Sequence, residues 1–412
     1  MTRPRARVLA VADSDSYLKW AASTLERLAS AEGPGTADDL LVDPALVVLR
    51  SPTDPTDEQV AAAVSRSRWH DRPPERVTLR ALRRLLLATR PDVVLVATTG
   101  PAAELLLRTL ADLPFRPLLV TGLPGMSVPA TELALRYRAG VDVLVVHSHR
   151  ERDEFVDLAA RLDIPLDVVV DRLPFLAGNA HAGPVAPDTT PLRRVVLAPQ
   201  AKFPAQLDER VELLAALGRL AAARPDLDVV VKLRGLAGDA QTHRERWPFD
   251  TLVAEHAELP GVDALRVATG PLDEFLERGT ALVTVSSTAV LEALALGLRA
   301  LVVVGEQGVG EHDLTLVYAD SGLVGTLDDV AAGRAFTADP AWLERNYLHP
   351  EPDELPAALA AGVAAAHART LPAVVVPARV GSLPSRVRRR VRLALPRGSR
   401  WARSAADVLL RR

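Results

Sequence analysis

Three consecutive hydroxyl side chains, Ser286, Ser287 and Thr288, stand between an apolar run at 281–285 and a helix-forming run at 289–296. A strand that passes at once into a helix leaves the first backbone N–H groups of that helix without partners, and the helix dipole adds positive charge there. With the hydroxyls, such a turn can bind phosphate. Plain N-capping by Ser287 or Thr288 explains the same residues, so both interpretations stay open. Glu292, one turn further, belongs to the same candidate group.

Donors also follow two other apolar runs of the second half. Lys232 and Arg234 stand at the end of the run 228–232, and Gly235 follows them. Two cations there suit a nucleotide diphosphate, or they mark an ordinary surface strand edge. Gln200 and Lys202 follow the run 194–198 and would face the same cleft, unless they belong to an ordinary loop.

The first half offers weaker candidates after its own apolar runs. Asp13 and Asp15 follow the run 8–12, and either carboxylate could take a proton from an acceptor hydroxyl or merely cap a helix. Gly122 and Gly125 could line an acceptor pocket, although turn chemistry alone explains them. Of His147 and His149, we expect one to line the cleft and the other to cap a helix. His147 is the cleft candidate.

The loop 305–312, GEQGVGEH, rims the same predicted cleft, where Glu311 and His312 could contact a sugar or ribose or simply lie on the surface. No acid follows at the spacing that a dinucleotide fingerprint needs. The chain has no HExxH, GxSxG or GxxxxGK[ST] motif, and two histidines at i, i+2 are weak evidence for a metal. We therefore expect no metal and no cofactor.

Short Val/Leu runs alternate with stretches of helical period, which predicts parallel sheets covered on both faces. The expected strands are 8–12, 45–49, 93–97, 117–121, 143–146 and 166–170, then 194–198, 228–232, 264–267, 281–285 and 300–304. The expected helices include 17–28, 79–88, 206–223, 273–278, 289–296 and 353–369. In such sheets ligands bind beyond the carboxyl ends of the strands, which is where the candidate residues stand.

A Gly/Pro/Ala/Thr-rich stretch without periodicity separates the two series of strands. We expect an acceptor-side domain at 1–178, a linker at 179–192, a nucleotide-donor domain at 193–370 and a basic helical tail at 371–412. From Arg379 onward the tail has eleven arginines and one acid, Asp407. It is either a solvated helix pair returning to the first domain or a contact for an anionic partner.

The chain has 412 residues, which suits two or three domains, and its formal net charge of -3 gives no reason to expect nucleic acid. It has no cysteine, which excludes disulfides and thiolate chemistry. The opening apolar run is too short for a signal peptide, and no run approaches the length of a membrane span. We therefore expect a soluble cytoplasmic protein.

The second half resembles the nucleotide-binding domain of GT-B glycosyltransferases, most closely bacterial capsule and teichoic-acid enzymes such as polysialyltransferases and glycerophosphotransferases. Ser286–Thr288 match their strand-Ser-Ser/Thr-helix element, and 232–235 takes the place of their Lys-x-His-Pro motif without its His-Pro pair. The whole chain also looks like uncharacterised glycosyltransferases of actinobacteria.

The resemblance implies an α/β fold with two Rossmann-like, doubly wound parallel-sheet domains facing across a cleft. It also implies metal-independent sugar transfer from a nucleotide-linked donor to a glycan or lipid-linked acceptor, in cell-surface glycan synthesis. Lys232, Arg234 and residues 286–288 would stabilise the departing phosphate, and Asp13 or Asp15 would deprotonate the acceptor. The tail, 386–412, could contact an anionic membrane at its inner face.

Two other functions remain open. A nucleotide-sugar 2-epimerase has the same architecture and needs several carboxylates and a histidine, some of which Glu311, His312 and Asp313 could supply. A non-catalytic assembly protein could use degenerate domains to hold a partner. An epimerase turns over without an acceptor, and a non-catalytic protein with no nucleotide site would not be stabilised by any nucleotide.

Overall fold

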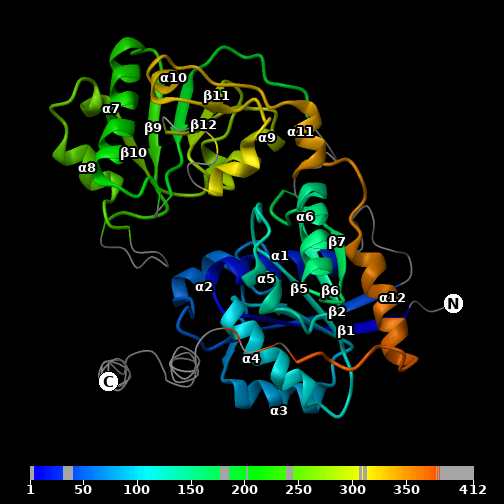
Figure 1. The fold of residues 1–412 in the computed structure, drawn as a ribbon. Coiled ribbons are helices and arrows are strands. Elements are labelled where there is room, and N and C mark those ends of the chain that lie inside the picture. Colours follow the sequence, from blue (N-terminus) through cyan, green and yellow to red (C-terminus); the bar gives the residue numbers. More distant parts are fainter. Residues whose placement is uncertain are drawn as a thin grey trace, which may run out of the picture. The chain divides into compact units, whose positions relative to one another are not determined.

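The computed structural model describes residues 4–30, 40–176, 185–200, 203–237, 245–305, 309, 313–376, 378 and 380. The chain forms two compact units (Figure 1). Unit 1 comprises Met1–Phe175 and Pro352–Arg412, and unit 2 comprises Leu176–Glu351. Each unit is built around its own parallel sheet, which confirms the α/β architecture expected for both halves.

Unit 1 has a seven-stranded sheet in the order β3-β2-β1-β4-β5-β6-β7, with every pair parallel. Its strands are β1 (Arg5–Ala12), β2 (Leu41–Leu49), β3 (Glu75–Val77), β4 (Val93–Ala97), β5 (Leu118–Gly122), β6 (Val143–Val146) and β7 (Asp167–Val170). Its helices are α1 (Asp15–Ala29), α2 (Asp57–Val64), α3 (Leu79–Thr89), α4 (Gly100–Ala111), α5 (Glu132–Arg136), α6 (His149–Arg161) and α12 (Leu355–His367).

Alternate side chains of the central strand β1 enter different cores, because successive strand residues point to opposite faces. Val8 and Ala10 pack in the cluster that α1 and α12 cover, whereas Leu9 and Val11 pack in the cluster that α3 and α4 cover. Both faces of the sheet are therefore covered by helices and shielded from solvent, which explains why its strands are apolar throughout.

Unit 2 has a six-stranded parallel sheet in the order β10-β9-β8-β11-β12-β13. Its strands are β8 (Arg194–Leu197), β9 (Asp228–Lys232), β10 (Arg266–Ala268), β11 (Thr280–Thr284), β12 (Arg299–Val303) and β13 (Val324–Gly325). Its helices are α7 (Leu207–Ala223), α8 (Phe249–Glu255), α9 (Ala289–Ala295), α10 (Leu327–Ala331) and α11 (Pro340–Arg345).

In both sheets the strand order reverses beside the first strand of the unit. The reversal lies between β1 and β4 in unit 1 and between β8 and β11 in unit 2. The loops after these two strands diverge to opposite faces, and a ligand crevice commonly opens between such loops. The topology thus selects the loops that follow β1 and β4, and those that follow β8 and β11, as the places for chemistry.

The end of the chain corrects the expected domain boundary, because residues 352–370 belong to unit 1 and not to the second domain. Asp353 accepts hydrogen bonds from Arg27 at 2.8 Å and from the backbone N–H of Arg172 at 2.8 Å. Leu355 and Leu359 of α12 enter a unit 1 core cluster. Helix α12 therefore completes the apolar covering of the first sheet.

The expected linker, 179–192, is anchored at its C-terminal end. Asp188 accepts hydrogen bonds from Thr190 Oγ1 at 2.6 Å and from the backbone N–H of Gly279 at 2.7 Å. These bonds and the Arg278 guanidinium hold the pKa of Asp188 well below its usual range, although partial desolvation opposes them. Residues 185–191 are thus fastened to unit 2.

The sequence analysis did not predict the edge strands β3 and β13, because strands of three and two residues are too short to show a periodic pattern. The expected helix at 273–278 is only a 3₁₀ turn at Leu272–Glu274. Within the described part of the chain, no helix is long and apolar enough to cross a membrane. The predicted basic helical tail from 381 onward lies outside the described residues.

Candidate functional site

The reversal point of unit 2 is bridged by one side chain. Gln200, three residues after β8, donates from Nε2 to the carbonyl oxygen of Ser286, which follows β11. Thr284 Oγ1 donates back to the carbonyl of Ala198 at 2.8 Å. Two of the predicted donor-binding loops are therefore joined, as their positions in the strand order require.

A buried arginine that the sequence analysis missed holds this loop in place. Arg210 of α7, 2% exposed, donates to the carbonyl oxygens of Gln200 at 3.0 Å, Pro204 at 2.8 Å and Trp247 at 2.8 Å. It also pairs with Glu245. Because a guanidinium presents five donors in a fixed fork, one residue fixes the segments after both β8 and β9. An arginine within a helical stretch gave no signal of this role.

Two of the three hydroxyls in the 286–288 turn are engaged inside the chain. Ser286 hydrogen-bonds the buried Tyr318, whose pKa is raised by burial, with this bond opposing the shift. Ser287 Oγ accepts from the backbone N–H of Ala289 at 3.3 Å, whereas the N-cap residue of α9 is Thr288, whose side chain makes no capping hydrogen bond. Thr288 is half-buried. The phosphate-binding interpretation of this turn stays a prediction.

Lys232 ends β9 half-buried, and Arg234 lies exposed two residues beyond it. Burial raises the pKa of the nearby Glu245 carboxyl, whereas the charges of Arg210 and Arg234 oppose that shift. Glu292 lies half-buried on α9. Lys202, Glu311 and His312 lie outside the described residues.

In unit 1, Asp13 links the loops at the point where the strand order reverses, between β1 and β4. Its Oδ1 accepts from the backbone N–H of Thr99 at 2.8 Å, and its Oδ2 accepts from Thr99 Oγ1 at 2.5 Å. Its carbonyl oxygen accepts from Ser51 Oγ at 3.0 Å and Thr53 Oγ1 at 3.1 Å. One residue after β1 thus ties together the loops that follow β1, β2 and β4.

Asp13 is fully buried, and this desolvation raises its pKa from 3.8 to about 6 despite the bonds from Thr99. Its positive neighbour is Arg138, 3% exposed, which donates to Tyr17 Oη at 2.6 Å and to the carbonyl of Thr98 at 2.8 Å. A carboxylate with both oxygens occupied and no exposed surface does not reach an acceptor in this conformation. Asp15, half-buried in the first turn of α1, is the accessible acid of the pair.

His147 is fully buried, which corrects its predicted place on a cleft wall. Its Nδ1 lies 2.6 Å from the carbonyl of Asp171, and its Nε2 accepts from Trp20 Nε1 at 3.1 Å. Burial lowers its pKa from 6.5 to about 4, so the ring is neutral at pH 7. It serves as a polar core residue.

Gly122 is buried beneath Trp20, where an added Cβ would overlap the indole ring. The indole takes the space that a side chain would need, so Gly122 serves packing and not the expected pocket. Gly125 is half-buried, and its carbonyl accepts from Ser127 Oγ at 3.4 Å, as in a turn.

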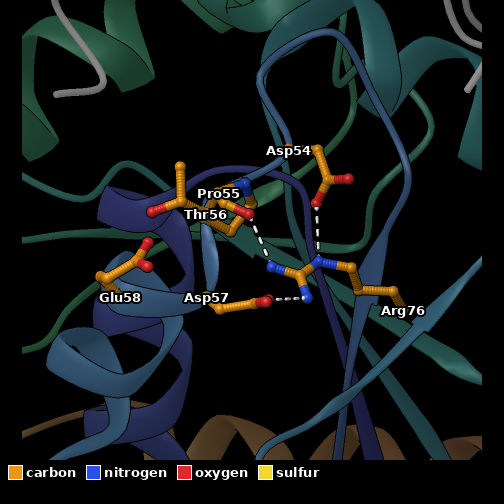
Figure 2. Close-up of a pocket in the computed structure, with 6 residues that line it drawn as sticks. All are labelled: Asp54, Pro55, Thr56, Asp57, Glu58 and Arg76. Atoms are coloured by element: carbon orange, nitrogen blue, oxygen red, sulfur yellow. Dashed lines mark hydrogen bonds and ion pairs between the residues drawn. The ribbon is translucent and has the colours of Figure 1, made fainter. Parts of the chain in front are cut away.

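A polar surface pocket of unit 1 lies between the β2–α2 connection and β3, lined by Asp54, Pro55, Thr56, Asp57, Glu58 and Arg76 (Figure 2). Arg76 donates there to Asp54 at 3.3 Å, to Asp57 at 2.6 Å and to the Pro55 carbonyl at 2.7 Å. The cation is thus neutralised by the pocket's own carboxylates, and we assign no ligand to it.

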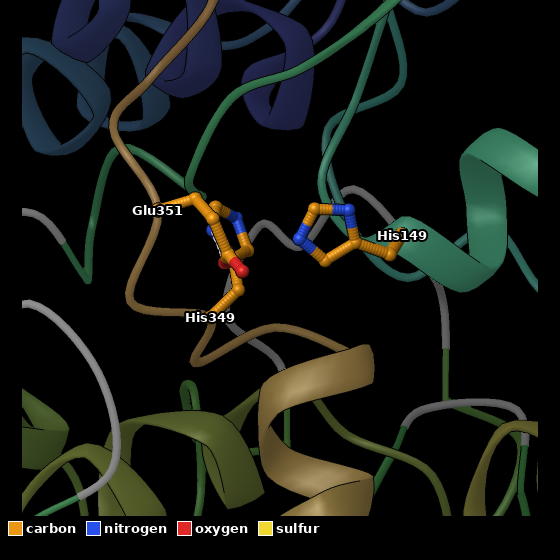
Figure 3. A group of neighbouring side chains, drawn as sticks. All are labelled: His149, His349 and Glu351. Atoms are coloured by element: carbon orange, nitrogen blue, oxygen red, sulfur yellow. Dashed lines mark ion pairs between the residues drawn. The ribbon is translucent and has the colours of Figure 1, made fainter.

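Figure 3 draws His149, His349 and Glu351. His349 Nδ1 and Glu351 Oε2, both in unit 2, are 3.6 Å apart. His149 is the first residue of α6 in unit 1, but the cap is Ser148, whose side chain accepts from the backbone N–H of Glu151 at 3.1 Å, so the expectation that a histidine caps this helix is wrong. We build no metal site from side chains of the two units.

Solved structures show the same fold. The chain is similar to an S. aureus MnaA–UDP co-structure, with 12% identity, a TM-score of 0.55, and coverage of 91% of this chain and 100% of that one. It is also similar to a crystal structure described as a "putative UDP-N-acetylglucosamine 2-epimerase from Listeria monocytogenes", with 14% identity, a TM-score of 0.54, and coverage of 90% of this chain and 98% of that one. These likenesses establish the two-domain GT-B-like fold and nothing finer.

No curated protein matches the chain. A family described as "Putative glycosyltransferase (DUF6716)" matches residues 8–362, which include every strand and helix from β4 to α11. The chain therefore belongs to this family, DUF6716.

Proposed function

We propose that this protein is a glycosyltransferase that moves a sugar, or a sugar-like group, from a nucleotide-linked donor to an acceptor hydroxyl. The observation that carries the proposal is the family match over residues 8–362. A finer part of the proposal is that the acceptor is a glycan or a lipid-linked glycan of the cell surface, and that no metal or cofactor takes part.

The proposal assigns the donor to unit 2. The loops after β8 and β11 meet at the reversal of the strand order, and Gln200 links them. Lys232 and Arg234 extend from the adjacent strand β9, where two positive charges would stabilise the departing diphosphate. The exposed Arg234 is the better placed of the two for a ligand that arrives from solvent.

The proposal assigns proton transfer from the acceptor to Asp15 of unit 1. Asp13 holds its neighbouring loops, whereas Asp15 retains accessible surface and stands at the carboxyl end of the central strand. We therefore expect Asp15→Asn to lower kcat and to leave the affinity for the nucleotide unchanged.

A second candidate is a nucleotide-sugar 2-epimerase, because similar solved structures are described as UDP-N-acetylglucosamine 2-epimerases. The two reactions differ in their substrates and products. An epimerase acts on the nucleotide-sugar alone, whereas a transferase passes the sugar to an acceptor and releases the free nucleotide. Product analysis with UDP-N-acetylglucosamine alone separates them. Accumulation of an epimeric nucleotide-sugar would replace our proposal with the second candidate.

The first experiment is a thermal-shift screen with CMP, CDP, UDP, GDP and ADP. A nucleotide at 100 times its dissociation constant stabilises its unit by about 2.7 kcal/mol, a shift of several degrees. Arg234→Gln should weaken the stabilising nucleotide roughly tenfold, because one charge-assisted contact is lost. Arg219→Gln, at an exposed position on α7, is the matched control and should change nothing. Absence of a shift with every nucleotide would contradict both enzyme functions.

A further inference from the structure

Helix α3 of unit 1, with the sequence LRALRRLLLAT, contains three arginines and no acid. Leu82 and Leu86 are fully buried against the sheet, and Arg80, Arg83 and Arg84 are exposed. Arginines at i, i+3 and i+4 share one side of a helix, so their charges lie together on the surface. We call this set the α3 arginine face.

Within the described part of the chain, no acidic side chain pairs with the α3 arginine face. The arginines of the neighbouring elements differ, since Arg108 lies 3.5 Å from Glu104 and Arg116 lies 2.5 Å from Asp142. The protein as a whole carries a formal charge of -3, so three adjacent unneutralised cations are a local departure from its charge balance.

Apolar side chains accompany these charges. Leu79 and Leu85 of α3 are only half-buried, and they pack against the same core cluster as Val374 of the C-terminal segment. The next two residues after it, Val375 and Val376, are 52% and 45% exposed. Arg116 also donates to the Pro372 carbonyl at 2.8 Å, which fastens this segment to unit 1.

Cations mixed with exposed aliphatic groups fit the interface of an anionic bilayer. Arginine heads bind lipid phosphates there, and aliphatic groups enter the boundary of the acyl region. A surface for single-stranded nucleic acid would instead offer aromatic platforms for the bases. Helix α3 consists only of Leu, Arg, Ala and Thr, so it provides no such platform.

We propose that the α3 arginine face docks unit 1 on a bilayer surface that contains anionic phospholipids. The surface is separate from the donor site proposed for unit 2, so the inference goes beyond sugar transfer and does not depend on it. It also differs from the contact predicted for 386–412, because it is formed by helix α3.

The test is co-sedimentation of the full chain with vesicles of phosphatidylcholine alone or with about 30% phosphatidylglycerol. Only the anionic vesicles should retain the protein, and about 0.5 M NaCl should release it, because electrostatic attraction is screened. The triple variant R80Q/R83Q/R84Q should bind roughly 100-fold more weakly, since each arginine near an anionic surface contributes roughly a fivefold factor and the three factors multiply.

The matched control is R161Q/R193Q/R219Q, which removes the same charge from three other exposed arginines. It should bind as the unaltered protein does. Equal loss in both triple variants would overturn the proposal, because net charge alone would then govern binding. Equal retention in both would also overturn it, since α3 would contribute nothing. Tighter binding to a single-stranded oligonucleotide than to anionic vesicles, with the same dependence on Arg80, Arg83 and Arg84, would assign the face to nucleic acid instead.

Discussion

Replacing Asp13 by asparagine should stabilise unit 1 at pH 7–8, although it alters a buried residue with several hydrogen bonds. Burial raises the pKa of Asp13 from 3.8 to about 6, so the ionised form is disfavoured in the native state. A displacement of this size corresponds to about 3 kcal/mol between the neutral and ionised forms. An amide side chain at this position carries no charge and avoids that cost.

Part of this gain is offset by a hydrogen bond that must reverse. In the Asp13→Asn variant the side-chain oxygen still accepts from the Thr99 backbone N–H, whereas the side-chain amide must donate to Thr99 Oγ1, which in the unaltered protein donates to Asp13. Reversal costs about 1 kcal/mol. The net expectation at pH 8 is a gain of about 1–2 kcal/mol, or roughly 3–6 °C in Tm for a unit of this size.

The pH dependence gives the sharper test. Between pH 3.8 and about 6 the native protein holds a proton that the unfolded chain has released, so its free energy of unfolding falls as pH rises and levels off above about pH 6. The advantage of Asp13→Asn should therefore grow across that window, and near pH 4, where the charge no longer matters, the reversed hydrogen bond should leave the variant about 1 kcal/mol less stable. Calorimetry from pH 4 to 8 measures it, with Asp43→Asn at a partly exposed ion pair as the control. A variant that is less stable than the unaltered protein at pH 8, or a difference independent of pH, would refute the reasoning.

Three further substitutions test the packing and anchoring of each unit by calorimetry. Arg210→Met should lower the free energy of unfolding of unit 2 by about 3–5 kcal/mol, because Glu245 and three carbonyls lose a buried partner. Arg210→Lys should restore only part of the lost stability. Full restoration by lysine would contradict the role given to the forked geometry of the guanidinium. Asp188→Ala should lower the free energy of unfolding by about 2–3 kcal/mol at pH 7. This loss should shrink as the pH falls below the ordinary pKa of an aspartate, because the native carboxylate with its depressed pKa then stabilises the fold less and less. A loss that stays the same at low pH would contradict the role of the negative charge. Gly122→Ala should cost about 1–3 kcal/mol through contact with Trp20, and a neutral result would show that the indole can move.

Sequence patterns alone determined the architecture of this protein. Apolar runs such as 93–97 and 143–146 coincide with β4 and β6, because a strand buried on both faces must be apolar throughout. The sequence also predicted that Gln200, Lys232 and Ser286 lie at or just beyond strand ends, and the carboxyl ends of parallel strands all lie at one edge of the sheet. The lack of cysteine excluded disulfides and thiolate chemistry, and no HExxH, GxSxG or GxxxxGK[ST] motif is present in the sequence.

Only the tertiary structure decided what the polar side chains do. Asp13, His147 and Gly122 look like site residues in the sequence, yet burial and the partners Thr99, Asp171 and Trp20 come from segments distant in the chain. Arg210 shows the converse, since nothing in a helical stretch reveals that its guanidinium meets three loop carbonyls. The sequence order determines which strand a residue follows, whereas its solvent exposure and its partners depend on contacts that form only when the sheet and its covering helices assemble.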